Sequence, residues 1–249
     1  MISPDAYADL CDLVIDPAFN PELVIPDKPI RRVFVTAEKN TFEKHLRFLR
    51  SLPDKPELIY ARSDQQFTRQ MFWSVKEHVS HVYAVNCEFQ HPMLTQIPLG
   101  VACPSALPAR NAEKSVLCYM NFNSAEPSYE SHASYKYLRQ DCARHFPWVK
   151  TDSPELMQSA YYKRLLASAF VICPFGFGID TYRFYESVWC GARPVVITSG
   201  LDPLYKKFGA VIVNDWSEVT EEFLKEKLKE VPEVDSSIFD VKSHIPHSQ

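Results

Sequence analysis

The 249-residue chain lacks an excess of positive charge, a long apolar run and an N-terminal leader pattern. Its net charge of −4 argues against a nucleic-acid partner bound through bulk charge. No apolar stretch reaches the roughly 18–20 residues that a transmembrane helix needs. The first residues, MISPDAYADLCDLVIDP, carry acids where a signal peptide carries bases, and they contain no continuous apolar core. These absences predict a soluble, cytoplasmic protein without a membrane anchor.

Several chemical motifs are also missing. No two of the seven cysteines have CxxC spacing, and several lie in apolar runs, which is typical of buried thiols in a reducing compartment. No Asp-x-Asp occurs, the motif that would hold a divalent cation on a diphosphate. No G-x-G-x-x-G follows a predicted strand, which disfavours a nicotinamide- or flavin-dependent oxidoreductase. We therefore expect chemistry without a metal or a resident cofactor.

Glycine is scarce and unevenly placed. Five of the six glycines fall within 34 residues, which predicts unusual backbone in that part of the chain: Gly176, Gly178, Gly191, Gly200 and Gly209. Within it, residues 170–173 are an apolar strand, 174–178 a tight loop, and a helix follows. Asp180 is a suitable N-cap for this helix and Gly191 a suitable C′ residue.

A strand, a glycine-containing loop and a helix N-terminus form a favourable site for an anion, because free N–H groups and the helix dipole point the same way. Arg183 lies in the first turn of the predicted helix, where a cation opposes the dipole. A negative ligand is therefore expected nearby. Glu186, three residues on, shares its face, so a simple surface ion pair is the alternative.

Apolar patterning predicts two α/β units with parallel sheets and right-handed crossovers. The first has strands at 31–37, 58–61 and 82–85, and helices at 41–52 and 65–79. The second has strands at 115–120, 148–150, 170–173, 193–198 and 210–214. Its helices include 129–145, 153–168, 202–208 and one capped by Ser217 or Thr220. We expect an N-terminal domain at 1–100, a linker at 101–114 and a C-terminal domain at 115–249, two Rossmann-like domains facing a cleft.

The second unit resembles exostosin-like glycosyltransferases, the glycosyltransferase family 47 group with a GT-B fold. The likeness covers residues 115–216 and is weak over 1–95. Phe175 stands where that family often carries a basic residue. The matching residues are Cys173-Pro174, Gly176, Gly178, Asp180, Arg183, Glu186, Gly191, Pro194-Val195-Val196, Pro203-Leu204-Tyr205, 210–213, Asp215-Trp216 and Ile97-Pro98-Leu99-Gly100.

The resemblance implies an inverting transfer of a sugar from a nucleoside diphosphate donor, here a UDP-sugar, to a hydroxyl of a glycan acceptor. Arg183 would then pair with the diphosphate and Glu186 would accept from the ribose hydroxyls, roles that suit a forked guanidinium and a carboxylate. The nucleotide sugar is a substrate, so no cofactor is expected. The donor-binding residues would be Asn121, Asn123, Pro174, Gly176, Gly178, Asp180, Arg183 and Glu186. For the two asparagines, an Asx turn is the alternative.

An inverting transfer needs a general base for the acceptor hydroxyl. Glu38 and Asp64 follow strands of the first unit and are the leading candidates, with Glu88 and His91 behind them. Without an Asp-x-Asp, the leaving nucleotide would be stabilised by Arg183, the helix dipole and backbone N–H groups, independently of a metal. A first unit that lacks a base would instead leave a nucleotide-sugar- or glycan-binding module without turnover.

Overall fold

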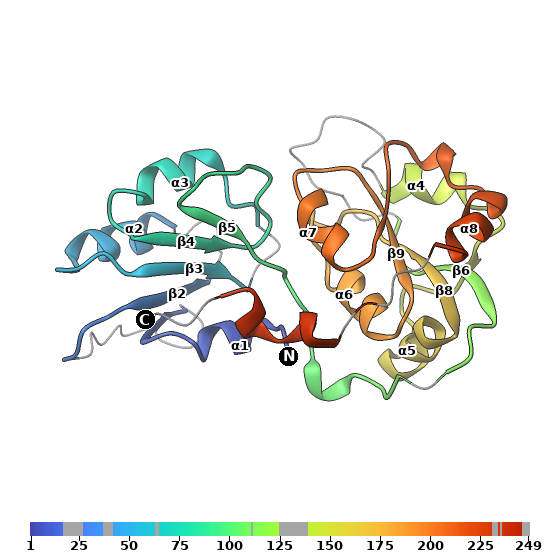
Figure 1. Ribbon diagram of the computed structural model, residues 1–249, viewed down its shortest axis with the longest axis horizontal. Helices are drawn as coiled ribbons and strands as arrows, with labels where there is room; N and C mark the ends of the chain where they lie inside the picture. The colour runs from blue at the N-terminus through green and yellow to red at the C-terminus, as the bar shows by residue number, and fades with distance from the viewer. Residues whose placement is uncertain are drawn as a thin grey trace. The chain divides into compact units, whose positions relative to one another are not determined.

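The computed structural model describes residues 1–16, 27–36, 42–62, 65–110, 112–124, 139–230, 234 and 236–245 (Figure 1). The chain divides into two compact units, Met1–Leu99 with Phe239–Gln249, and Gly100–Ile238. Each unit contains a five-stranded sheet whose strands are all parallel, as expected of an α/β chain with two Rossmann-like halves. The division groups the final segment with the first unit, whereas we expected 115–249 to form one domain. It also assigns the expected linker at 101–114 to the second unit.

The first unit has its strands in the spatial order β1-β2-β3-β4-β5, the same as their order along the chain. Its elements are α1 (Pro4–Ala8), β1 (Leu13–Ile15), β2 (Arg32–Thr36), α2 (Phe42–Ser51), β3 (Glu57–Ala61), α3 (Arg69–Val75), β4 (His81–Ala84) and β5 (Leu94–Gln96). Patterning does not predict β1 and β5, because a three-residue strand is too short to show a period. The other strands and α2 lie within one or two residues of their predicted bounds.

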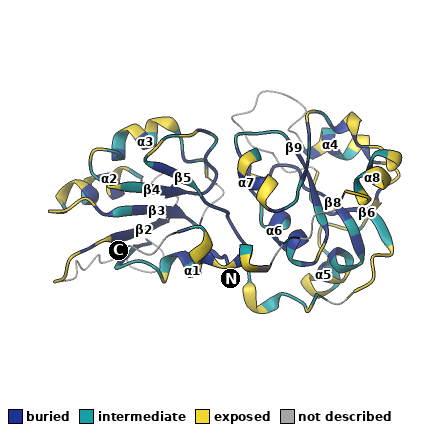
Figure 2. Cartoon of the chain, in the orientation of Figure 1, coloured by how far each residue is buried: buried dark blue, intermediate teal, exposed yellow. Residues whose placement is uncertain are grey.

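One face of the first sheet packs against α2 and α3, and the side chains between them form a hydrophobic core cluster. The strands are drawn dark blue in Figure 2 because their side chains are buried. The cluster includes Val33, Val35, Leu46, Leu49, Leu58, Tyr60, Phe72, Val75 and Val82. Full burial of such a side chain stabilises a fold by about 1.5–3 kcal/mol relative to exposure. The helical spacing of Phe42, Leu46 and Leu49 therefore reflects contact with the sheet.

The second unit has the strand order β10-β9-β8-β6-β7. Its elements are η1 (Pro104–Ala106), β6 (Val116–Met120), α4 (Arg139–His145), β7 (Lys150–Thr151), α5 (Gln158–Ala167), β8 (Ser168–Ile172), α6 (Tyr182–Trp189), β9 (Arg193–Ile197), α7 (Asp202–Lys207), β10 (Val211–Val213), η3 (Trp216–Glu218) and α8 (Glu221–Leu228). The segments η4 (Ser236–Phe239) and η5 (Val241–Ser243) follow. The predicted helix at 153–168 begins later than expected, at Gln158. The start of the predicted helix at 129–145 lies outside the described residues.

The order of the second sheet creates a topological switch point. The first strand along the chain, β6, pairs with β7 on one side and with β8 on the other, and the chain then continues through β9 to β10. In open α/β sheets, ligands bind outside the carboxyl ends of the two strands where the order reverses. Those ends are Met120 of β6 and Ile172 of β8. The described strands of the first sheet show no such reversal, so topology favours the second unit as the binding unit.

The ends of α6 distinguish a correct prediction from a wrong one. Gly191 has a φ of +71°, its N–H donates to Val188 O and the N–H of Ala192 donates to Ser187 O. This pair of bonds is the Schellman motif, so Gly191 is the predicted C′ residue. The predicted N-cap is wrong, because Thr181 occupies that position and Asp180 precedes it. At α8 the structure selects Thr220, whose hydroxyl accepts from Phe223 N–H.

The cysteines are all free, and five of the seven are buried, in agreement with the apolar runs around them. Burial raises the pKa of Cys118 and of Cys173 to about 12, so both remain thiols at neutral pH. The longest described helices, α2 and α5, have ten residues each, about 15 Å at 1.5 Å per residue. Among the described residues, no helix has the length and apolarity to cross a membrane.

Candidate functional site

Arg183 lies at the switch point of the second sheet. Its Nε donates to the main-chain oxygen of Asn121, the residue that follows β6, over 2.9 Å. The guanidinium also lies over the ring of Phe122, 5.5 Å from its centroid. Its two terminal nitrogens make no hydrogen bond to any described residue. A half-buried guanidinium fixed through Nε therefore presents its terminal donors at the carboxyl edge of β6 and β8.

Backbone donors supplement this guanidinium in the loop between β8 and α6. The N–H of Gly176 donates to Gly178 O and the N–H of Thr181 to the Asp180 carboxylate. By contrast, the N–H groups of Gly178, Ile179 and Arg183 have no hydrogen-bond partner in the described part of the chain. Unpaired N–H groups at the start of a helix attract anions, because the partial positive charge of the dipole adds to theirs.

Arg139 is a second guanidinium at the same loop, and sequence reasoning missed it. This buried residue of α4 donates from Nε to Phe175 O over 3.0 Å. A Cβ added at Gly176 would lie 2.9 Å from Arg139 Nη2, so the glycine leaves room for the guanidinium. Neither Gly176 nor Gly178 has a positive φ, so the first is required for space and not for unusual backbone. No spacing rule in the sequence connects Arg139 to a loop 36 residues away.

Asp180 belongs to a buried polar cluster beneath the loop. Its Oδ2 accepts from the Tyr185 hydroxyl over 2.6 Å, and its Oδ1 accepts from the Tyr205 hydroxyl over 3.2 Å. The Tyr205 hydroxyl also donates to Ile179 O. Both carboxylate oxygens are thus engaged within the protein. Asp180 joins the loop to α6 and α7, and this explains why it precedes the helix without capping it.

Glu186 is buried, with 7 % of its surface exposed, and its Oε1 accepts from the Tyr162 hydroxyl of α5 over 3.2 Å. Burial raises the pKa of the Glu186 carboxyl, against the opposing effects of Tyr162 and the nearby Arg183. No ion pair joins Arg183 and Glu186 in the described ranges, which removes the surface-pair alternative. A diol that reached Glu186 would share the carboxylate with Tyr162.

The remaining predicted donor-binding residues lie close by in the chain. The Asn121 amide donates to Asp152 O and Ser153 O, so its side chain fixes the loop after β7, while its main-chain oxygen orients Arg183. Asn123 is half-buried two residues further on, and Pro174 and Gly178 are buried in the loop after β8. The structure thus brings the Asn121 turn, the 174–178 loop and the start of α6 together at one edge.

The carboxyl edge of the first sheet carries a separate charged cluster. Glu38 and Asp64, the predicted bases, lie outside the described residues. Asp16, which follows β1, is buried and its Oδ2 accepts from Arg62 Nη1 over 2.9 Å; Arg62 also pairs with Asp5. Arg62 has a φ of +66°, an uncommon conformation for a residue other than glycine. Such local strain is concentrated at functional sites.

The other two candidate bases of the first unit are engaged. The Glu88 carboxylate accepts from the Gln66 amide over 3.1 Å. The Nδ1 of His91 accepts from Met93 N–H over 3.1 Å, which places the proton of the neutral ring on Nε2. His91 therefore presents a donor, not a basic lone pair. Within the described ranges, no three His, Cys, Asp or Glu side chains converge as metal ligands would.

Comparison with known proteins adds no family to this geometry. No protein-family model matches the chain, and no curated protein matches it. The likeness to exostosin-like glycosyltransferases stays a prediction from the residues quoted above.

Proposed function

We propose that this protein is an inverting glycosyltransferase with a GT-B arrangement, which binds a nucleoside diphosphate sugar, a UDP-sugar, in its second unit. The observation that carries the proposal is Arg183, which is oriented through Asn121 O and whose terminal nitrogens pair with no described residue at the switch point. A forked guanidinium beside unpaired backbone N–H groups matches the several oxygens of a diphosphate. The buried Glu186 is the proposed partner of the ribose hydroxyls.

In the proposed reaction, an oxygen of the glycan hydroxyl forms a bond to the anomeric carbon of the sugar. The bond from that carbon to the diphosphate oxygen breaks, and the nucleoside diphosphate leaves with the electron pair. Arg183 and the N–H groups of Gly178 and Ile179 would stabilise the charge that develops on the leaving group. The hydroxyl proton would pass to a carboxylate of the first unit, for which Glu38 and Asp64 stay the candidates.

Calorimetric titration of UDP tests the assignment directly. We expect Arg183→Ala to weaken UDP binding by about 10–100-fold, the effect of one charge-assisted contact. Arg144→Ala is the matched control, because Arg144 is an exposed arginine of the same unit. This variant should bind UDP with the affinity of the wild type. Equal affinity of wild type and Arg183→Ala, or no UDP binding by either, would show that the site is assigned wrongly.

The alternative is a nucleotide-sugar- or glycan-binding module without turnover. It is favoured because the described acids and the imidazole at the edge of the first unit are already engaged and do not offer a free base. Asp16 is ion-paired with Arg62, Glu88 accepts from Gln66, and the Nδ1 lone pair of His91 accepts from Met93 N–H. Release of UDP from a donor sugar in the presence of glycan acceptors separates the two functions. Tight UDP binding without released UDP would favour the module.

A further inference from the structure

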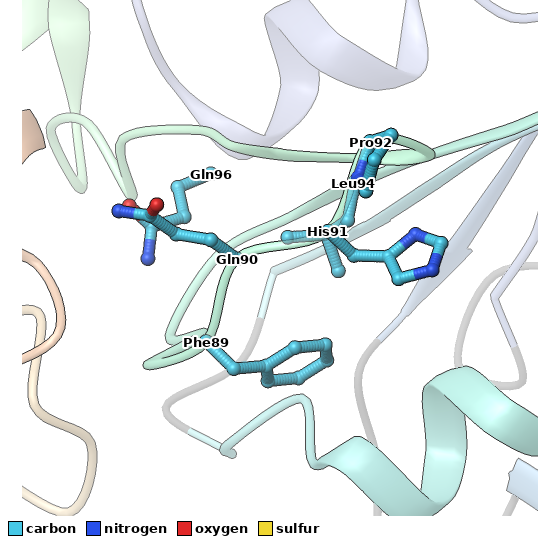
Figure 3. A pocket seen from close by; sticks show the side chains of 6 residues that line it. All are labelled: Phe89, Gln90, His91, Pro92, Leu94 and Gln96. Carbon is cyan, nitrogen blue, oxygen red and sulfur yellow. The ribbon is translucent and has the colours of Figure 1, made fainter.

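A pocket of about 460 Å³ lies beside β5 in the first unit, and none of the described residues that line it is assigned to the nucleotide. It is lined by Phe89, Gln90, His91, Pro92, Leu94 and Gln96 (Figure 3). In this view the rings of Phe89 and His91 extend to one side and the amides of Gln90 and Gln96 to the other. None of these six described residues carries a carboxylate, an ammonium or a guanidinium. Their polar groups are neutral amides and one imidazole, which suits an uncharged ligand with several hydroxyls.

The ring of His91 is held in one orientation by its surroundings. It lies 4.5 Å from the Phe72 ring and 6.0 Å from the Trp73 ring, measured between centroids. Because its Nδ1 accepts from Met93 N–H, Nε2 carries the proton of the neutral ring. The pocket thus has a fixed donor in its wall.

The amides complete the polar side of the pocket. Gln96 donates to Cys87 O over 2.7 Å, which anchors this side chain at the end of β5. Gln90 makes no hydrogen bond to any described residue, and its amide offers both a donor and an acceptor. A ligand with adjacent hydroxyls, each a donor and an acceptor, can pair with such an amide at two points.

Trp73 extends this surface beyond the pocket. It packs edge-on against His91, yet 55 % of its surface is exposed, while the neighbouring Phe72 and Phe89 are buried. Lys76 Nζ lies 4.3 Å from the Trp73 ring centroid, and Arg69 Cζ lies 5.0 Å from that of Phe89. The two cations lie against aromatic rings, and neither is among the described residues that line the pocket. An exposed flat ring next to neutral hydrogen-bonding groups marks a recognition surface.

We propose that this pocket and Trp73 bind a pyranose ring of a glycan. The C–H face of a pyranose is apolar and packs on a flat aromatic ring, and its hydroxyls pair with amides and an imidazole N–H. A phosphate or a nucleotide would find no cation among the described residues that line the pocket, and Lys76 lies against the ring of Trp73 outside it. The assignment of this sugar as the acceptor rests on the proposed function, whereas binding of the sugar itself does not.

Saturation-transfer NMR with cellobiose, lactose and N,N′-diacetylchitobiose tests the proposal. We expect transfer to ring C–H protons of at least one disaccharide, reduced at least five-fold by Trp73→Ala and by Gln90→Ala. Trp148→Ala is the matched control, since Trp148 is also exposed, at 38 %, but lies in the second unit. Gln90 is an exposed side chain, so its loss leaves the fold intact and keeps the test valid should Trp73→Ala fail to fold.

Absence of transfer for all three sugars, or an equal reduction by Trp73→Ala and Trp148→Ala, would overturn the proposal. Titration of UDP against the same variants separates it from the proposed function. Retained UDP affinity with lost sugar signal supports a distinct glycan pocket. Sugar binding by a wild type that does not bind UDP would leave the pocket in place and remove the transferase.

Discussion

At the scale of single residues, the structure separates side chains that face a ligand from those that hold the site together. Arg183 keeps terminal donors unpaired by any described residue, while both carboxylate oxygens of Asp180 and the NH₂ group of Asn121 bond within the protein. Residue type alone cannot make this distinction, because carboxylates and amides suit both roles. The sequence could nominate these residues as a group but could not assign their partners.

A buried histidine gives the first unit a predictable response to pH. His45 of α2 is buried, and neither of its ring nitrogens has a hydrogen-bond partner among the described residues. Burial lowers its pKa to about 4, with Lys44 acting in the same direction and Asp16 opposing it. The folded state therefore favours the neutral ring, whereas the unfolded chain protonates near its ordinary pKa of about 6.5.

Proton linkage makes the first unit less stable as the pH falls, because the unfolded chain binds a proton at His45 more readily than the folded state does. The stability that neutral His45 permits is fully present above pH 6.5 and is lost as pH falls from there toward 4, by up to about 1.4 kcal/mol per pH unit. We expect His45→Leu to remove this dependence without destabilising the unit at pH 7, because it also removes two unpaired polar atoms. Hydrogen exchange of first-unit amides between pH 4.5 and 7.5 measures the difference. A variant as sensitive to pH as the wild type would contradict the prediction.

At the scale of elements, the second unit depends on how α5 and α6 end. Lys114 Nζ donates to Leu166 O near the end of α5 and to Cys190 O at the end of α6, over 2.8 and 2.7 Å. It also lies 3.5 Å from the position of a Cβ at Gly191. One ammonium thus satisfies carbonyls of both helix ends, where a cation complements the dipoles.

Gly191→Ala should therefore destabilise the second unit by about 1–2 kcal/mol, because its φ of +71° is unfavourable for a residue with a Cβ. The control is Gly200→Ala, since Gly200 does not have a positive φ and the change should cost little. Urea denaturation of the two variants gives the comparison. Equal midpoints for both would show that the backbone conformation at Gly191 is not the source of the loss.

Element prediction worked where the periodic signal was long and failed where the determinants are distant. The strands at 32–36, 57–61 and 193–197 have buried runs that patterning detects. The start of α6 was misplaced because Asp180 bonds to Tyr185 and to Tyr205, the latter 25 residues away. Arg139 was missed for the same reason, since its link to Phe175 O depends on how α4 packs.

At the scale of the whole molecule, sequence reasoning identified two α/β halves but not the full membership of each. Strand order was also beyond it, since pairing β6 between β7 and β8 depends on packing and leaves no local signal. Yet this order creates the switch point at which Arg183 and the 174–178 loop lie. Arg183 could be nominated from sequence, while its place in a binding edge required the topology.

The division of the chain leads to a last prediction about its C-terminal segment. Phe239, Val241 and Ile245 are buried, and this segment groups with the first unit although the second unit precedes it in the chain. Phe239→Ala should therefore destabilise the first unit by about 3–5 kcal/mol, the usual cost of such a truncation in a core. The matched control is Phe223→Ala, since Phe223 is a half-buried phenylalanine of α8 in the second unit. Hydrogen exchange should show faster exchange in β2 to β4 for Phe239→Ala, with β8 and β9 unchanged. Faster exchange in β8 and β9, with β2 to β4 unchanged, would contradict the prediction. It would mean that the C-terminal segment stabilises the second unit and that the two domains follow one another along the chain.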